Sequence, residues 1–334
     1  MSLKRAFIIV VLILGIGGIC SGYYFWSIHP IGIGNGSAEL VELRVGEPLS
    51  VFAARLEDRG LMRGSRNWSR IAQLVGMATQ SQAGEYWVYP SDTRKELLKR
   101  IVSGDVVTYQ IRIIEGWTVN DLLSHLRSQE NLILQIRDND PENLLEVLGI
   151  VAESAEGMFL PDTYQFVKGN TDIDILRRAY DAMQHELKDV WSKRANDLPY
   201  ETAYDLLTVA SLIEKETGMD EDRAKIGQVF LSRLKEDMRL QTDPSVIFGL
   251  GAEFDGDLRK SDLRRDTSYN TYLYKGLPPS PISLPGRSSL LAAAKPAGTN
   301  YRYFVAKGDG SSHFSETLAE HNAAVTRYQL RQLK

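Results

Sequence analysis

Two carboxylates stand close together in the stretch SLIEKETG, which runs from residue 211 to residue 218. Glu214 and Glu216 bracket Lys215 at the end of a segment whose apolar residues have the spacing of an amphipathic helix. A glutamic acid that keeps its proton near neutral pH can act as the general acid in cleavage of a glycosidic bond. Either glutamate is therefore a candidate for this chemistry, although glutamates at helix ends are usually solvated surface residues.

The geometry of an ideal helix does not separate the two glutamates. With the apolar face centred near Leu206, Lys215 lies opposite that face, and the glutamates lie on its two flanks. Position along the helix favours Glu216, because Gly218 is a typical helix stop and Glu216 then occupies the last turn. The negative end of the helix dipole and partial burial both raise the pKa of a carboxyl at that place.

Two later stretches, LQTDPSV and SYNTY, supply hydrogen-bonding side chains and aromatic faces that suit N-acetyl sugars. Their candidate substrate-binding residues are Gln241, Asp243, Tyr269 and Asn270. The alternative for these residues is turn-building, because Asp-Pro and Asn-Thr are common in loops. The Pro-rich segment 276–286 is expected to form a rigid loop at the border of the groove in which the substrate would bind.

The sequence does not indicate a metal site or a cofactor. His313 and His321 are too poorly accompanied by other ligand types. The segment FDGDLRKSD lacks the acidic spacing and the closing glutamate of a calcium loop. Cys20 is the single cysteine, which excludes internal disulfides and cysteine-rich metal sites.

Length and composition are those of a globular protein with room for two domains. The chain has 334 residues, of which 43% are hydrophobic and 25% are charged. The formal net charge of -4 gives no support for nucleic-acid binding, which would require a basic face.

The N-terminal segment predicts a membrane anchor. Residues 6–26 contain no charged residue, and a helix of that length spans the hydrocarbon core of a bilayer. Lys4 and Arg5 precede the segment, so a cytoplasmic tail at residues 1–5 and an extracytoplasmic remainder are expected. This orientation corresponds to a single-pass protein of the cytoplasmic (inner) membrane. The alternative is a cleaved signal peptide, which shares the basic start and the apolar run.

Periodicity divides the rest of the chain into three parts. A Gly-rich linker is expected at residues 27–37, followed by a small α/β module at residues 38–115. Residues 116–334 are expected to form a helix-rich domain with a small irregular sheet. The expected fold class is therefore α+β.

Several long stretches together resemble the membrane-anchored endolytic murein transglycosylases, the MltG or YceG-like family. The stretches are ASLIEKETG, MRLQTDPSVIFGLG, TSYNTYLYKGLPPSPISLPG and EGMFLPDTYQF. With the N-terminal span and the small module, the resemblance covers nearly the whole chain. It implies that the module at residues 38–115 is LysM-like, which leaves two roles open for it, glycan binding or a spacer.

The resemblance also implies the activity and the residue roles. Family members cut peptidoglycan between N-acetylmuramic acid and N-acetylglucosamine without water and leave 1,6-anhydromuramyl ends. One glutamic acid serves first as acid and then as base. In such enzymes the acid ends a helix and precedes a small hydroxyl residue, which selects Glu216 followed by Thr217. Glu214 is then a supporting residue or an ion-pair partner of a nearby basic side chain.

Two other functions stay open beside a transglycosylase acting on nascent glycan. One is a non-catalytic glycan-binding scaffold for cell-wall synthases, the penicillin-binding proteins, which are candidate partners in either case. The other is a hydrolase of the same bond, which needs a second carboxylate to activate water. Asp243 or Asp162 could supply that carboxylate.

Overall fold

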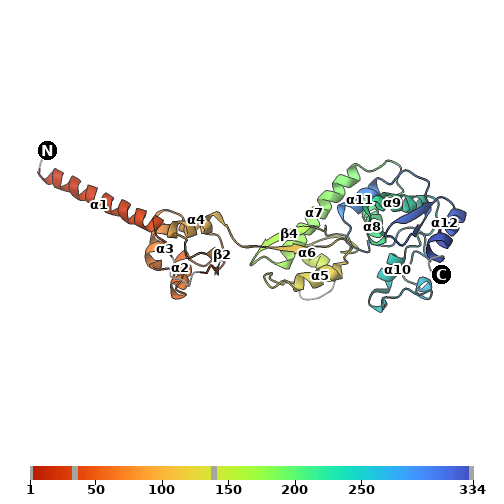
Figure 1. Ribbon diagram of the computed structural model, residues 1–334, viewed down its shortest axis with the longest axis horizontal. Coiled ribbons are helices and arrows are strands. Elements are labelled where there is room, and N and C mark those ends of the chain that lie inside the picture. Colours follow the sequence, from red (N-terminus) through yellow and green to blue (C-terminus); the bar gives the residue numbers. More distant parts are fainter. Residues whose placement is uncertain (1–2, 32–36, 137–140, 331–334) are drawn as a thin grey trace. The chain divides into compact units, whose positions relative to one another are not determined.

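The structure of the chain is a computed structural model that describes residues 3–31, 37–136 and 141–330 (Figure 1). The middle of the expected linker, residues 32–36, lies outside the described residues. The described chain combines helices with small two-stranded sheets. The predicted α+β class is therefore confirmed.

Internal contacts divide the chain into two compact units, which are described separately. The N-terminal unit comprises Met1–Tyr109 together with Gln165–Gly169. The C-terminal unit comprises Gln110–Tyr164 and Asn170–Lys334.

The first helix, α1 (Leu3–Ile28), contains an apolar window without buried residues. The window Phe7–Tyr24 has a mean hydropathy of 2.2. By length and composition this helix could cross a membrane, and a signal sequence at an N-terminus has the same properties.

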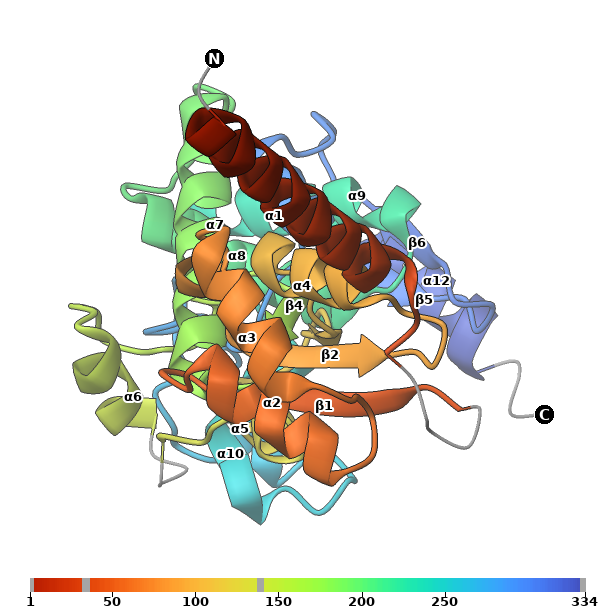
Figure 2. The ribbon, with the colours of Figure 1, turned by 90° about the vertical axis from the view of Figure 1, so that its left-hand side faces the viewer.

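The remainder of the N-terminal unit packs three helices on a two-stranded sheet (Figure 2). Its elements are β1 (Glu39–Leu43), α2 (Leu49–Asp58), α3 (Ser65–Leu74), a 3₁₀ turn (Ala78–Gln80), β2 (Gly84–Val88) and α4 (Arg94–Ser103). The strands are antiparallel, with Leu40 opposite Trp87. The core contains Phe52, Trp68 and Tyr86, which are fully buried.

Two further strands, β3 (Thr108–Arg112) and β4 (Thr163–Val167), pair with each other. Each strand has residues in both units, so the chain leaves the N-terminal unit along β3 and returns along β4. The returning segment contributes side chains to that unit. The ring of Phe166 lies 5.6 Å from that of Tyr109, and Lys168 Nζ lies 3.0 Å from Glu85 Oε1.

The C-terminal unit is mostly helical. Its helices are α5 (Val119–Arg127), α6 (Pro141–Leu148), α7 (Asp172–Ser192), α8 (Ala203–Glu216), α9 (Asp220–Lys235), α10 (Asp243–Leu250), α11 (Arg287–Ala294) and α12 (Leu318–Val325). Short helical turns lie at Gly251–Glu253, Asp262–Arg264 and Thr326–Leu330. The expected small sheet consists of β5 (Tyr303–Ala306) and β6 (Ser312–Ser315), which are antiparallel and pack against α12.

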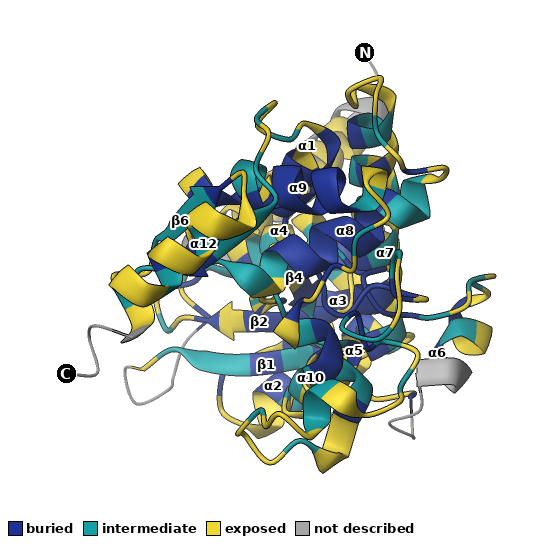
Figure 3. Ribbon diagram, turned by 90° about the vertical axis from the view of Figure 1, so that its right-hand side faces the viewer, coloured by how far each residue is buried: buried dark blue, intermediate teal, exposed yellow. Residues whose placement is uncertain are grey.

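Helix α8 lies at the centre of this unit and contacts α7, α9, α10 and α11. It begins at Thr202, which forms a capping box with Asp205. Residues 206–213 are all buried, so the helix is not the amphipathic element that its sequence predicts (Figure 3). Its buried polar side chains are hydrogen-bonded, which compensates for their loss of water. Ser211 Oγ donates to the Thr208 carbonyl at 2.7 Å and accepts from the Ile282 N–H at 3.0 Å.

Candidate active site

The C-terminal end of α8 presents the candidate acid. The last helical residue is Glu216, because Thr217 adopts an extended conformation with φ -152° and ψ 141°. The helix therefore ends before Gly218, with Glu216 in its last turn as predicted, but Gly218 does not have the left-handed φ of a typical glycine stop. Thr217 Oγ1 instead accepts a hydrogen bond from the Met219 N–H at 3.0 Å and shapes the turn into α9.

The carboxyl group of Glu216 lies in a desolvated but partly accessible position. The pKa of Glu216 is raised to about 7, mainly by burial and also by the nearby charge of Asp243. A hydrogen bond from Thr242 and the charge of Arg233 act in the opposite direction. The direction expected from the sequence is therefore present in the structure, and burial is the main cause. A carboxyl with this pKa is protonated in a large fraction of molecules at neutral pH.

Thr242 lies in the stretch LQTDPSV, whose side chains were predicted to hydrogen-bond sugars, but its hydroxyl is bonded to the candidate acid instead. Its Oγ1 donates to Glu216 Oε1 at 2.5 Å. Thr242 is the N-cap of α10, yet its hydroxyl makes no capping bond because it is used by Glu216. Two buried hydroxyl residues hold it in place. The Thr242 N–H donates to Thr271 Oγ1 at 3.0 Å, and its carbonyl accepts from Ser245 Oγ at 2.8 Å.

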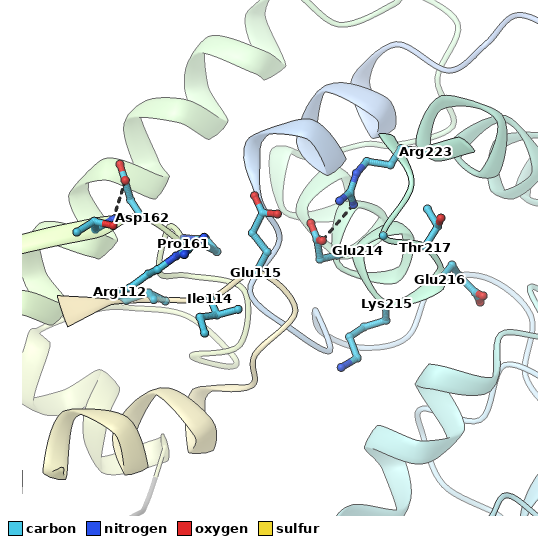
Figure 4. A pocket seen from close by; sticks show the side chains of 13 residues that line it. Arg112, Ile114, Glu115, Pro161, Asp162, Glu214, Lys215, Glu216, Thr217 and Arg223 are labelled. Carbon is cyan, nitrogen blue, oxygen red and sulfur yellow. Dashed lines mark hydrogen bonds and ion pairs between the residues drawn. The ribbon is translucent and has the colours of Figure 1, made fainter. Parts of the chain in front are cut away.

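Two cavities meet at Glu216. Cavity A has a volume of about 720 Å³, and its lining includes Arg112, Glu115, Asp162, Glu214, Lys215, Glu216 and Arg223 (Figure 4). Cavity B has a volume of about 380 Å³, and its lining includes Glu216, Arg233, Gln241, Asp243, Tyr272 and His321. Within the described part of the chain, Glu216 is the one lining residue that both cavities share. Its carboxyl group points away from Glu214 and Glu115 (Figure 4).

The structure brings Gln241 and Asp243 to cavity B beside Glu216. Gln241 has a left-handed backbone with φ 49°, and its N–H donates to the Thr271 carbonyl at 3.2 Å. Asp243 Oδ1 accepts from the Tyr272 O–H at 2.6 Å. Burial, followed by this bond, raises the pKa of Tyr272 above its ordinary value, so the phenol remains a donor. These two candidate residues are therefore close enough to the acid to share a ligand with it.

Tyr269 and Asn270 do not line either cavity. Asn270 is fully buried, and its amide donates to the carbonyls of Leu263 and Arg265. Tyr269 donates or accepts a bond with Ser280 at 2.7 Å and lines a separate cavity. These contacts match the turn-building alternative for Asn270.

Glu214 forms an ion pair, which is one of the two roles expected for it. Its Oε1 lies 3.1 Å from Arg223 Nη1, and both side chains are almost fully buried, at 5% and 7% exposure. Its Oε2 accepts from the Gly286 N–H at 2.9 Å, immediately before α11. Glu214 thus ties the end of α8 to α9 and α11, which fixes the position of the neighbouring Glu216.

The two carboxylates considered for water activation lie on different sides of the acid. Asp162 lines cavity A, and its Oδ1 accepts from the Thr163 N–H at 2.7 Å. Asp243 lines cavity B and influences the pKa of Glu216. Among the residues described, no group of three or more His, Cys, Asp or Glu side chains could hold a metal ion.

A second carboxyl with a raised pKa lies outside both cavities. Glu156 is 6% exposed and accepts from the Val119 N–H at 3.0 and 3.1 Å, at the start of α5. Burial raises the pKa of Glu156 to about 7. It lines a separate cavity of about 880 Å³ with Tyr269. Glu156 is the first residue of the stretch EGMFLPDTYQF, which contributes to the family resemblance, but the sequence reasoning assigned it no role.

Comparison with protein families decides the relationship of the chain. The family model of the YceG-like family matches residues 41–327. The chain belongs to this family. The resemblance inferred from the motifs is therefore confirmed.

Relatives of this YceG-like chain carry one name. An endolytic murein transglycosylase of Bacillus subtilis (strain 168) is 30% identical over 318 residues, which cover 90% of this chain and 88% of the relative. One of Streptococcus pneumoniae serotype 2 is 25% identical and is matched over 97% of this chain and 64% of its own length. A crystal structure of a YceG-like protein from Listeria monocytogenes has a TM-score of 0.53 and 29% identity, covering 87% of this chain and all of that one.

For this YceG-like chain, Thr242→Val is expected to raise the pKa of Glu216 by about half a unit to one unit, because a bond that favours the carboxylate is lost. The measurement is a ¹³C NMR titration of the Glu216 carboxyl. Thr242→Ser keeps the hydroxyl and serves as the control. An unchanged pKa in the valine variant would show that the hydroxyl does not tune the acid.

Proposed function

We propose that this chain is an endolytic murein transglycosylase that cleaves peptidoglycan glycan strands and uses Glu216 as its acid. The observation that carries the proposal is the position of Glu216, a partly accessible carboxyl with a pKa of about 7 where two cavities meet. A polysaccharide can extend from the acid toward either cavity, as cleavage inside a strand requires. The names of the relatives support the same substrate.

The proposed reaction needs one carboxyl group. Glu216 donates its proton to the glycosidic oxygen as the bond from that oxygen to the anomeric carbon of the muramyl residue breaks. The resulting carboxylate then takes the proton of the C6 hydroxyl of the same muramyl residue while O6 bonds to the anomeric carbon. The acid is regenerated, no water is consumed, and the product carries a 1,6-anhydro ring. Gln241, Asp243 and Tyr272 are placed to hydrogen-bond the sugars in cavity B.

Mass spectrometry of murein digested by the full chain tests the proposal. Anhydromuramyl ends are the expected products. Reducing ends would instead favour a hydrolase, with Asp243 or Asp162 as the carboxylate that activates water. Binding without any cleavage would favour the scaffold function.

The activity is expected to fall as pH rises through about 7, because only protonated Glu216 can donate to the leaving oxygen. Above that midpoint kcat/KM should decrease about tenfold per pH unit. A pH–rate profile with soluble glycan strands measures this limb. Undiminished kcat/KM at pH 9 would contradict the assignment of a carboxylic acid with a pKa near 7.

We further propose that α1 anchors the chain in the cytoplasmic membrane, with residues 1–5 in the cytoplasm and residues 6–26 in the bilayer. The linker predicted at residues 27–37 is shorter than expected, because α1 continues to Ile28 and Ile31 is buried in the core of the N-terminal unit. The apolar window and the two preceding basic residues support this orientation. Sequencing the N-terminus of the mature protein and extracting membranes with alkaline carbonate test it, since a cleaved signal peptide would be absent from the mature chain. At that location the catalytic domain, residues 116–334, would meet nascent strands and their synthases.

For the LysM-like module at residues 38–115 we propose glycan binding. Trp87 in β2 and Tyr89, just after the end of that strand, are each 42% exposed and line the same cavity. They line a cavity of about 500 Å³ with the polar side chains of Asp105 and Thr108. Exposed aromatic faces beside polar groups suit the stacking of sugar rings.

Trp87→Ala is therefore expected to weaken binding to insoluble murein about fivefold, since an aromatic contact of this kind contributes roughly 1 kcal/mol. The measurement is a pull-down in a Glu216→Gln background, which prevents cleavage. Leu74→Ala, at an exposed apolar residue of the same unit, is the matched control. Equal binding of both variants would favour the spacer role.

A further inference from the structure

Arg233 is a buried cation in the wall of cavity B. It lies in the last turn of α9, is 8% exposed and lines the cavity together with Glu216. Its Nε donates to the Arg302 carbonyl at 2.8 Å, and its Nη1 donates to the Leu240 carbonyl at 2.6 Å. Its guanidinium carbon is 5.4 Å from the centre of the Tyr303 ring. These contacts hold the guanidinium in one place.

Arg233 has no carboxylate bound to it. None of the ion pairs formed by the residues that the structure describes includes Arg233. Another arginine of the same helix shows the usual arrangement, because Arg223 is equally buried and pairs with Glu214. A buried charge without a counter-ion is costly, and burial accordingly lowers the pKa of Arg233. The absence of a resting partner therefore calls for a functional explanation.

The charged and titratable groups around Glu216 leave Arg233 as its electrostatic partner. Asp243 from α10 is negative, and Tyr272 from the following loop is held neutral by its raised pKa. His321 from α12 has a pKa lowered by burial and by the charge of Arg233, so its ring is neutral near pH 7. Among the described residues that line cavity B, Arg233 is thus the cation that remains charged at neutral pH.

We propose that Arg233 is the standing counter-ion of the Glu216 carboxylate that forms when the proton passes to the glycosidic oxygen. This inference rests on the proposed function. It makes Arg233 a positioning residue, since it acts through Glu216. During the interval between proton donation and proton recovery, the fixed positive charge stabilises the carboxylate without rearrangement of the site. Cavity B then contains an ion pair only in the intermediate, and the resting acid stays neutral.

Arg233→Met tests the inference because it keeps the length of the side chain and removes the charge. It is expected to raise the pKa of Glu216 by about one unit. The high-pH limb of kcat/KM should move upward by the same amount, while the maximal kcat falls about tenfold or more. Arg233→Lys keeps the charge and should restore most of the pKa and part of kcat. Arg259→Gln removes a charge from an exposed ion pair with Asp255, outside both cavities, and should leave both quantities unchanged.

The pKa of Glu216 is measured by ¹³C NMR, and the high-pH decrease of kcat/KM is measured from the pH–rate profile. Thermal unfolding verifies that each variant is folded. If Arg233→Met does not fold, Arg233→Gln keeps a donor for the Leu240 carbonyl and makes the same comparison. A folded, uncharged variant with an unmoved pKa and an unmoved limb would overturn the inference. The NMR titration needs no turnover, so it tests the electrostatic coupling between Arg233 and Glu216 independently of activity. A wild-type protein that releases no anhydromuramyl ends would contradict the proposed function and not this coupling.

Discussion

Glu216→Gln is expected to give a folded chain that no longer cleaves murein. The amide has nearly the shape of the protonated carboxyl, and its oxygen can still accept the hydrogen bond from Thr242. It has no acidic proton that it could transfer to the glycosidic oxygen. Loss of general acid catalysis alone reduces a rate by about 10²–10⁴-fold. Glu216→Gln also loses the base function of the second step, which reduces the rate further. The total reduction should therefore reach about 10⁴-fold or more. The measurement is the release of anhydromuramyl products, with circular dichroism to verify the fold.

Glu221→Gln provides the matched control, because Glu221 is an exposed carboxylate in the first turn of α9 and lines neither cavity. This variant should retain wild-type activity. Full activity of Glu216→Gln would instead refute the assignment of the acid.

The second large effect is expected on stability, at Glu214. Glu214→Ala removes the carboxylate that neutralises Arg223, and the buried guanidinium is left with only the hydroxyl of Ser289 and the exposed Asp220. Breaking a buried ion pair from one side costs about 3–5 kcal/mol. Because Asp220 keeps part of the pairing, a loss of about 3 kcal/mol in the free energy of unfolding is expected. Urea denaturation measures it.

The double variant Glu214→Leu/Arg223→Met distinguishes an unpaired charge from a loss of packing. Replacing both partners by apolar side chains should cost clearly less than the sum of the two single replacements. A strictly additive result would show that the ion pair itself contributes little to the position of the α8 end.

The position of Glu216 at the end of α8 could be predicted from the sequence because its signals are local. Its choice over Glu214 as the candidate acid came from the family resemblance. The end of a helix, an apolar flank and a following threonine are all contained in a few residues around Glu216. The end of the helix before Gly218 was predicted correctly, but the cause was not, because Thr217 leaves the helix in an extended conformation that no propensity signals. The burial of α8 on all sides was missed because Thr208 and Ser211 count as polar in a pattern, whereas their hydroxyls are bonded inside the unit.

The partners of the acid could not be predicted, because they come from distant parts of the chain. Thr242 follows Glu216 by 26 residues, and Arg233 comes from the opposite end of α9. Only tertiary packing brings them to one carboxyl. Asn270 shows the reverse error, because its polar side chain suggested a ligand contact while the fold uses its amide to bond the carbonyls of its own loop. Residue type alone does not separate these two uses.

The return of β4 makes the N-terminal unit discontinuous in sequence. A fragment that ends at residue 115 lacks Phe166 and Lys168, and it leaves the buried Glu85 without its ammonium partner. On the ribosome the unit therefore cannot acquire its last segment until residue 169 has emerged, after 55 residues of the other unit have been made. Truncation at the apparent domain boundary would yield an incomplete fold, so the glycan binding proposed for this unit has to be tested on the intact polypeptide.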